Sequence, residues 1–202
     1  MDASKFMAIM ISMVFINNFI LSKFLGLCPF IGVSKEIKPA FSMGSAVTFV
    51  ITMSSMITWV IYRYLLIPFD LTYLRTISFI LVIASFVQFV EMVIRKFFPA
   101  LYRAFGIYLP LITVNCAVLG AAVLNSETFF NANTGNAASF LMSLTQGFFA
   151  GVGFLLAMAL MSGIRQKLEV VDAPVSLRGV PLAFIIASLM SLAFMGFNGF
   201  KF

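Results

Sequence analysis

The sequence predicts an all-α integral membrane protein with six transmembrane helices, built as two inverted three-helix repeats. Three observations predict this fold: an apolar composition, six apolar runs and an internal repeat. Hydrophobic residues make up 62% of the 202 residues, charged residues make up only 10%, and the mean hydropathy is +1.08. Because a soluble domain carries roughly 25% charged residues, most of this chain is expected to face lipid or other helices.

The apolar runs fall, in order, at about 6–31, 39–62, 76–94, 104–126, 136–164 and 179–200. Each run is long enough to cross the hydrocarbon core as a helix, which takes roughly 20 residues. The polar joints between the runs are too short to be linkers between domains. The sequence therefore predicts a single membrane domain over residues 1–202, without a soluble catalytic domain. The N-terminus lacks the features of a cleaved signal, so the first run is expected to stay as a span.

Basic residues predict the orientation in the membrane. The 13 Lys and Arg residues are scattered at the ends of the runs, unlike the basic stripe of a nucleic-acid-binding protein, so no nucleic-acid partner is expected. The side of the N-terminus carries Lys5, Arg63, Arg75 and Lys201, and the other side carries Lys35, Lys38, Arg95, Lys96, Arg103, Arg165, Lys167 and Arg178. Because cytoplasmic loops carry the excess of Lys and Arg, both termini are predicted to lie outside the cytoplasm.

An internal repeat relates one half, about 1–98, to the other, about 99–202. The segment from Arg63 to Ser85 matches the segment from Arg165 to Ser188, because each contains an Asp, a Leu-Arg pair and an Ile-Ala-Ser sequence in register within one residue. Each half also carries one cysteine in its first span, with a glycine four residues later. Three spans per half is an odd number, which forces the two halves into opposite topology.

The cysteine-bearing helices are predicted to be broken or kinked. Pro29 follows Cys28, and Pro110 precedes Cys116 by six residues. A proline lacks the backbone N–H and collides with the carbonyl four residues earlier, here at Leu25 and Gly106. Inside a bilayer such a break is tolerated only where protein or a polar cavity satisfies the freed backbone groups.

The two cysteines are the candidate metal ligands, because the chain has no histidine. An iron–sulfur cluster with thiolate ligation needs four cysteines, so a second copy or a related subunit would have to supply the other two. Two other interpretations remain open: a pair of buried apolar thiols, or a disulfide.

Polar residues inside the predicted spans are further candidates. Glu91 is the only acid well inside a span, and Arg95 follows four residues later on the same helix face. Glu91 is therefore a candidate for ion handling or for a structural ion pair. Four amides are candidates for an ion path or for hydrogen bonds between helices, and these are Asn17, Asn18, Gln88 and Asn115.

Four segments carry a resemblance to a known family: NNFILSKFLGLCPFIGVSK, IPFDLTYLRTISFILVIASFVQFVEMVIRK, PALYRAFGIYLPLITVNCAVLGAA and LMSLAFMGFNG. Together they reach from the first span to the last. They resemble the family of the A subunits of the Rnf complex, an ion-pumping membrane oxidoreductase. The D and E subunits of the sodium-pumping NADH:quinone reductase are similar in fold, although their motifs match less closely.

The resemblance implies a [2Fe-2S] cluster inside the inner membrane of a bacterium or archaeon. Cys28 and Cys116 would provide two of the four ligands, and the homologous E subunit of the complex would provide the other two. The other Rnf subunits would carry flavins and iron–sulfur clusters. The complex would transfer electrons between reduced ferredoxin and NAD+ and couple this transfer to movement of Na+ or H+. This chain carries no nucleotide-binding motif, so it is expected to hold no complete active site by itself.

Two other functions compete with the electron relay. Inverted repeats with broken helices are also typical of secondary transporters, which would have a solute site and no chromophore. A membrane scaffold that only binds partner subunits would keep electron flow after both cysteines were replaced by serine.

Overall fold

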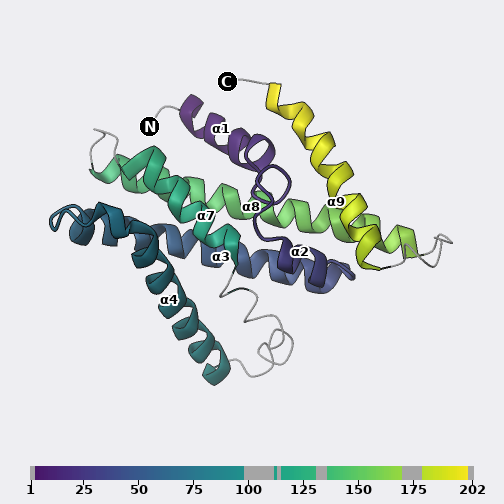
Figure 1. Cartoon of the computed structure of the whole chain (residues 1–202), viewed down its shortest axis with the longest axis horizontal. Helices are drawn as coiled ribbons and strands as arrows, with labels where there is room; N and C mark the ends of the chain where they lie inside the picture. The colour runs from purple at the N-terminus through teal and green to yellow at the C-terminus, as the bar shows by residue number, and fades with distance from the viewer. Residues whose placement is uncertain (1–2, 98–111, 113–114, 131–135, 170–178, 200–202) are drawn as a thin grey trace.

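The computed structural model describes residues 3–97, 112, 115–130, 136–169 and 179–199. Every regular element within these ranges is helical (Figure 1). The α-helices are α1 (Ala3–Ile11), α2 (Leu27–Val33), α3 (Ile37–Ile61), α4 (Arg75–Phe97), α7 (Cys116–Asn125), α8 (Asn136–Glu169) and α9 (Val180–Met195). Short π-helical segments extend three of them: η1 (Ser12–Ile16), η2 (Tyr62–Leu66) and η4 (Ser126–Phe130). The 3-10 segments are η3 (Thr72–Leu74) and η6 (Gly196–Gly199).

In the part of the chain that the structure describes, three helices are long and apolar enough to cross a membrane: Ile37–Leu66, Arg75–Val93 and Ala137–Leu168. They coincide with the predicted runs 39–62, 76–94 and 136–164. Shorter apolar helices lie in the first and last predicted runs, at Phe6–Ile16 and Val180–Met195. Within the predicted run 104–126, residues 104–111, 113 and 114 lie outside the described residues. Pro110 is one of them, and the repeat residues Asp172, Leu177 and Arg178 also lie outside.

Helices α3 and α8 lie side by side and form the centre of the molecule (Figure 1). Glycines let their backbones approach closely: a Cβ atom on Gly44 would lie 3.1 Å from Cα of Leu155, and one on Gly151 would lie 2.7 Å from Cα of Thr48. Because these contacts pair rising numbers on α3 with falling numbers on α8, the two helices are antiparallel. Close packing of small residues is what holds helices together in lipid, where burial of apolar area contributes little.

Four hydroxyl side chains of α3 have hydrogen-bond partners within the helix. Thr48, Thr52, Ser55 and Thr58 each donate a hydrogen bond of 2.7–2.9 Å to the carbonyl four residues earlier. The helix can therefore carry these hydroxyls into an apolar environment without leaving them unpaired. The indole of Trp59 donates a hydrogen bond of 3.1 Å to Oγ of Ser139. This bond connects the C-terminal end of α3 to the N-terminal end of α8.

The first predicted run, 6–31, is divided by a segment that is not helical. The run is helical to Ile16 and becomes helical again only at Leu27. Pro29 therefore lies in the first turn of α2, where its missing N–H leaves no helix hydrogen bond unmade. The predicted collision of Pro29 with the carbonyl of Leu25 does not arise, because the chain has already left the helix before Leu25.

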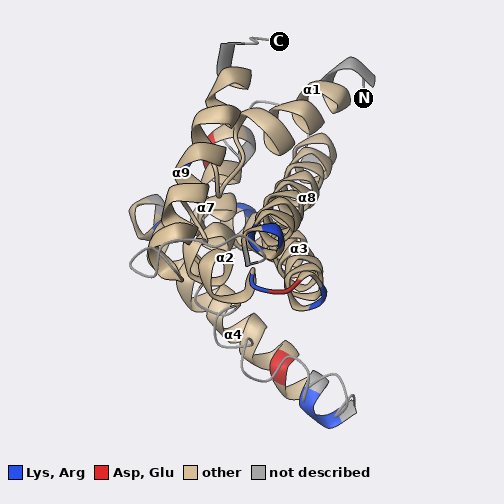
Figure 2. Cartoon of the chain, turned by 90° about the vertical axis from the view of Figure 1, so that its right-hand side faces the viewer, with Lys and Arg blue, Asp and Glu red and all other residues tan. Residues whose placement is uncertain are grey.

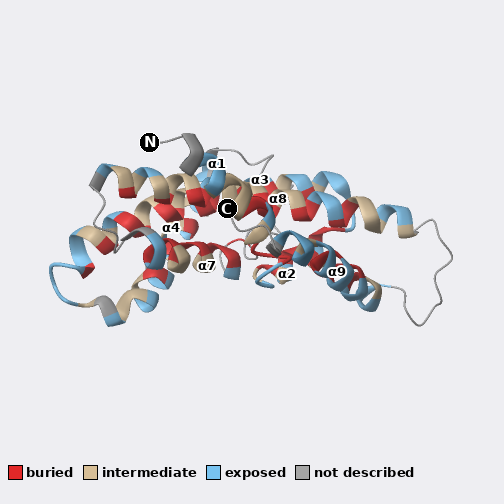
Figure 3. Cartoon of the chain, turned by 90° about the horizontal axis from the view of Figure 1, so that it is seen from above, coloured by how far each residue is buried: buried red, intermediate tan, exposed pale blue. Residues whose placement is uncertain are grey.

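Helix α4 leaves the body of the molecule at an angle (Figure 1). Only 17% of the positions in its apolar, membrane-spanning stretch are buried against the rest of the chain. Arg75 is its first residue, whereas Glu91, Arg95 and Lys96 lie toward its C-terminal end, where Figure 2 shows acidic and basic positions in red and blue. Buried positions recur along most of the length of α3, α7 and α8, whereas much of α9 is exposed (Figure 3).

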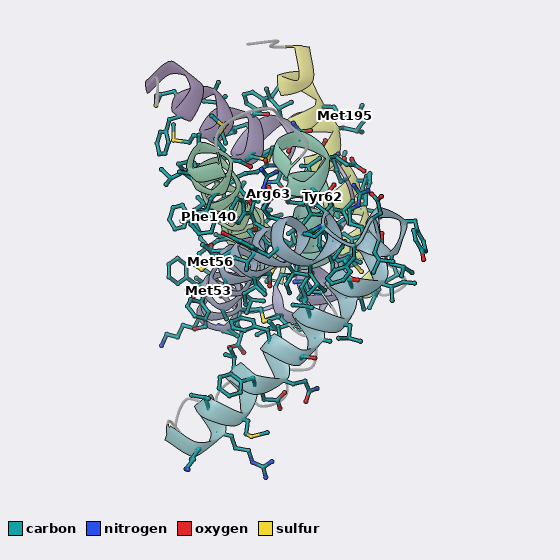
Figure 4. All side chains as sticks on the ribbon, turned by 90° about the vertical axis from the view of Figure 1, so that its left-hand side faces the viewer. Met53, Met56, Tyr62, Arg63, Phe140 and Met195 are labelled. Atoms are coloured by element: carbon teal, nitrogen blue, oxygen red, sulfur yellow. The ribbon has the colours of Figure 1, made fainter. Side chains whose placement is uncertain are left out.

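Phenylalanine and methionine side chains lie both in the core and on the outer surface. Phe30, Phe79, Phe154 and Met158 are fully buried. Met53 and Met56 on α3 and Phe140 on α8 lie along one edge of the molecule, and Met195 on α9 lies near another (Figure 4). The ring of Phe140 packs edge-on against Trp59 with a centroid distance of 5.1 Å.

Candidate functional site

Cys28 lies in the first turn of the short helix α2. Gly26 precedes this helix with a left-handed φ of 83°, a conformation that favours glycine. Pro29, Phe30 and Val33 are buried and form the packed face of α2, whereas Cys28 is exposed and free. The thiol is therefore presented on the outer side of a helix whose other side is fixed in the core.

The fully buried side chain of Asn18 anchors the non-helical segment before α2. The Nδ2 atom of Asn18 donates hydrogen bonds to the carbonyls of Val14 (3.1 Å) and Gly153 (2.8 Å). Its Oδ1 atom accepts hydrogen bonds from the amides of Ile20 (3.1 Å) and Leu21 (3.3 Å). Asn18 thus satisfies backbone groups that the end of the helix leaves unpaired.

Cys116 is the first residue of α7. Asn115 caps this helix, because its Oδ1 atom accepts a hydrogen bond of 3.0 Å from the amide of Ala117. Ala117 and Val118 are buried, whereas Cys116 is exposed and free. The two cysteines of the predicted repeat therefore have similar places, each in the first turn of a helix with its thiol outside the core.

The starts of these two helices are in contact. A Cβ atom on Gly26 would lie 3.0 Å from Oδ1 of Asn115 and 3.2 Å from Cβ of Ala117, the residues on either side of Cys116. One helical turn into α7, a Cβ atom on Gly120 would lie 2.6 Å from a methyl carbon of Leu25. The backbone that leads into Cys28 therefore packs directly on the helix that begins with Cys116.

The donor set suits a metal centre that is completed from outside this chain. Both thiols are free, so no disulfide joins them. Within the described ranges, no three or more His, Cys, Asp or Glu side chains lie close enough together to hold a metal ion. Two exposed thiols on adjoining helix starts can supply half of a tetrathiolate set, and their exposure leaves the remaining coordination to a second subunit.

The predicted amides divide between this region and other parts of the molecule. Asn18 and Asn115 hold the segments that lead into the two cysteines, whereas Asn17 donates a hydrogen bond of 3.1 Å to Oγ of Ser12. Gln88 is exposed and Glu91 is partly buried, and both lie on α4. From the sequence, the four amides formed one group of candidates. The structure shows that two of them, Asn18 and Asn115, form hydrogen bonds to backbone groups next to helix ends.

Arg165 is a residue whose contact the sequence did not reveal. It appeared there only as a basic residue and a mark of the repeat. In the structure its Nη1 atom donates hydrogen bonds to the carbonyl of Ile31 (2.7 Å) and to Oγ of Ser34 (2.9 Å). Arg165 therefore joins α8 to the far end of the helix that carries Cys28.

A buried polar contact between α7 and α8 was also missed. The Nδ2 atom of Asn125 donates a long hydrogen bond of 3.4 Å to the carbonyl of Ser143. Asn125, Ser143 and Gln146 are almost completely buried, and each has a side-chain atom without a hydrogen-bond partner. Serine in an apolar run gave no sign of this contact, because hydroxyl groups are common within membrane helices.

The comparisons with known proteins agree with one another. The family model described as "Rnf-Nqr subunit, membrane protein" matches residues 6–201. Similar curated proteins come from Salmonella arizonae (56% identical), Serratia proteamaculans (54%) and Azoarcus sp. (51%), and each match covers 97% of this chain and 97% of the relative. All three relatives share one name, which makes them A subunits of an "Ion-translocating oxidoreductase complex".

Proposed function

This chain belongs to the Rnf-Nqr family of membrane subunits, and from that premise we propose that it relays electrons through a [2Fe-2S] cluster shared with a homologous membrane subunit. The family match confirms the resemblance that the sequence carries. The chain is accordingly a membrane subunit of an ion-translocating oxidoreductase complex. The shared cluster, its ligands and the partner that completes it are the proposal.

The observation that carries the proposal is the packing of Gly26 on the residues that flank Cys116. It brings the two cysteine-bearing helix starts together although 88 positions separate the two cysteines in the sequence. Both thiols are free and lie outside the core, where a neighbouring subunit can reach them. Two unrelated buried thiols would not need adjoining helix starts of this kind.

Cys28 and Cys116 would hold the cluster from this side, and two cysteines of the homologous E subunit would hold it from the other. When bound, a [2Fe-2S] cluster supplies a one-electron carrier. The residues of this chain fix the thiols through the caps at Gly26 and Asn115 and exclude water through the buried apolar side chains beneath them. The N-terminal end of α7, whose first residue is Cys116, favours negative charge at that position.

The full membrane topology belongs to the same proposal: six spans in two inverted halves, with broken cysteine-bearing helices. One contact supports it. Arg75 and Glu127 form an ion pair of 3.3 Å. If the chain crosses the membrane six times, Arg75 follows the second span and Glu127 follows the fourth, so both lie on the side of the N-terminus. The smaller number of basic residues on that side supports an orientation in the inner membrane with both termini outside the cytoplasm.

The relay serves an ion pump that couples ferredoxin and NAD+ chemistry to the movement of Na+ or H+. The flavins and further clusters would belong to other subunits of the complex. Glu91 on α4 is the candidate for ion handling in this chain, because a carboxylate inside a span is costly unless it has a function or a partner.

The test measures the iron content and the electron paramagnetic resonance spectrum of the purified, reduced complex. The wild type is compared with the Cys28→Ser and Cys116→Ser variants. We expect each serine variant to lose the same [2Fe-2S] signal and two iron atoms per complex. Met92→Ser, at an exposed position of α4, is the matched control and should keep both.

Two results would overturn the proposal: a wild-type complex without this signal, or serine variants that retain it. Electron flow that continues unchanged in both serine variants would favour a scaffold. A colourless complex in which this subunit binds a solute would favour a transporter.

A further inference from the structure

The far end of α2 is held by a charged side chain from another helix. Arg165 of α8 donates from Nη1 to the carbonyl of Ile31 at 2.7 Å and to Oγ of Ser34 at 2.9 Å. Ser34 is fully buried, directly after the last residue of α2. Arg165 itself is partly buried. These two contacts join segments that are more than 130 residues apart in the sequence.

A helix as short as α2 depends on such contacts for its position. It has only seven residues, and isolated helices shorter than about 12 residues are marginal in water. The last four carbonyls of any helix lack partners within the helix, and Ile31 is among these residues in α2. A guanidinium group at this end both satisfies the carbonyl of Ile31 and complements the negative end of the helix dipole.

Arg165 acts close to the thiol. Ile31 lies three residues after Cys28, so its carbonyl is about one helical turn, or roughly 4.5 Å of axial rise, from the cysteine. The other end of α2 rests on α7 through Gly26. A helix that is fixed at both ends, with Phe30 and Val33 buried between them, leaves little freedom for Cys28.

We propose that Arg165 is a positioning residue for Cys28: by fixing the C-terminal end of α2, it sets the place of the thiol relative to Cys116. This inference deepens the proposed function, because the position of Cys28 matters most if the thiol is a ligand. Arg165 does not touch the ligand position, so its effect passes through α2. The alternative is a general contribution of Arg165 to folding, which would affect both cysteines alike.

Cys116 provides the internal reference for the test. The complex in membrane vesicles is treated with a small maleimide that crosses membranes, and mass spectrometry follows the labelling of each cysteine over time. The readout is the ratio of the two labelling rates. Arg165→Gln removes the charge and Arg165→Lys keeps it, while Lys167→Gln removes an exposed charge from the same helix.

We expect Arg165→Gln to raise the ratio of Cys28 to Cys116 labelling at least about fivefold, because loss of a charge-assisted hydrogen bond lets the end of α2 open. Arg165→Lys should restore part of the difference, since an ammonium group can also donate to both oxygens. Lys167→Gln should leave the ratio unchanged. If Arg165→Gln prevents assembly of the complex, Ser34→Ala replaces it, with a smaller rise in the same direction.

An unchanged ratio in an assembled Arg165→Gln complex, or an equal rise at both cysteines, would overturn the positioning role. Failure of the proposed function is distinguishable, because it appears as a missing [2Fe-2S] signal in the wild-type complex, whatever the ratio. If the wild type has that signal, the Arg165→Gln complex should show altered g-values or a reduced intensity, and Lys167→Gln should match the wild type.

Discussion

Gly26 lies against Asn115, so the residues that immediately precede the two cysteine-bearing helices pack together. A Cβ atom on Gly26 would lie only 3.0 Å from Oδ1 of Asn115, and that oxygen already caps α7. The same Cβ atom would lie 2.8 Å from the ring of Phe154 on α8. Three segments therefore meet at a position that has no room for a side chain.

Replacement of Gly26 by alanine is expected to destabilise the protein. The left-handed φ and the crowding together should cost about 2–3 kcal/mol. The midpoint of thermal unfolding of the purified chain in detergent measures this cost. Gly163→Ala is the control, because a Cβ at that position of α8 would meet no described atom within 4 Å apart from its own helix turn. Equal midpoints for the two variants would show that the contact at Gly26 is not tight.

Asn18→Ala should be far more disruptive than Asn17→Ala. The first change removes four hydrogen bonds to backbone groups in a buried environment, and about 2–4 kcal/mol of stability should be lost with them. Asn17 makes a single described side-chain hydrogen bond, to Ser12, and its loss should cost about 1 kcal/mol or less. Thermal unfolding in detergent compares the two. Similar losses for both variants would argue against Asn18 as the organiser of this segment.

Gly151→Val is expected to separate α3 from α8. A Cβ atom at Gly151 would meet Cα of Thr48 at 2.7 Å, and backbone cannot move aside as a side chain can. The yield of folded protein after size-exclusion chromatography in detergent should fall severely. Gly163→Val provides the matched control on the same helix. Normal yields of Gly151→Val would mean that the two helices pack less closely than the structure shows.

The ion pair of Arg75 and Glu127 gives a test of topology. Arg75→Cys and Glu127→Cys, each made in a chain whose two native cysteines are replaced by alanine, should both react with a membrane-impermeant maleimide from outside the cell. Lys35→Cys, on the other predicted side, should react only after the membrane is permeabilised. Labelling of Arg75→Cys and Glu127→Cys from opposite sides would refute the shared side, and labelling of both only after permeabilisation would reverse the orientation.

The same ion pair should contribute little to stability. Its two side chains are 25% and 57% exposed, and pairs with such exposure are worth about 0–1 kcal/mol. Arg75→Gln should therefore shift the unfolding midpoint only slightly, and a double variant with Glu127→Gln should behave like either single variant. A large loss in the single variants would show that the pair is shielded from solvent in the assembled protein.

The sequence by itself determined that the chain lies in a membrane and that its long apolar segments are helices. Apolar runs of membrane-spanning length predict helices because the backbone in lipid must satisfy its own hydrogen bonds, and this constraint is local in the chain. The long helices found at Ile37–Leu66, Arg75–Val93 and Ala137–Leu168 follow from it. The two cysteines stood out for an equally local reason, since they are the only thiols in a chain without histidine.

Only the tertiary structure decided how these elements meet. Pro29 indicated an interruption near Cys28, but the placement of the non-helical segment depends on Asn18 and its bond to Gly153, 135 residues away. The role of Arg165 likewise depends on Ile31 and Ser34 in another part of the chain. Contacts of this kind arise from packing between distant segments, and neither apolar periodicity nor residue spacing carries information about which distant partner a side chain will find.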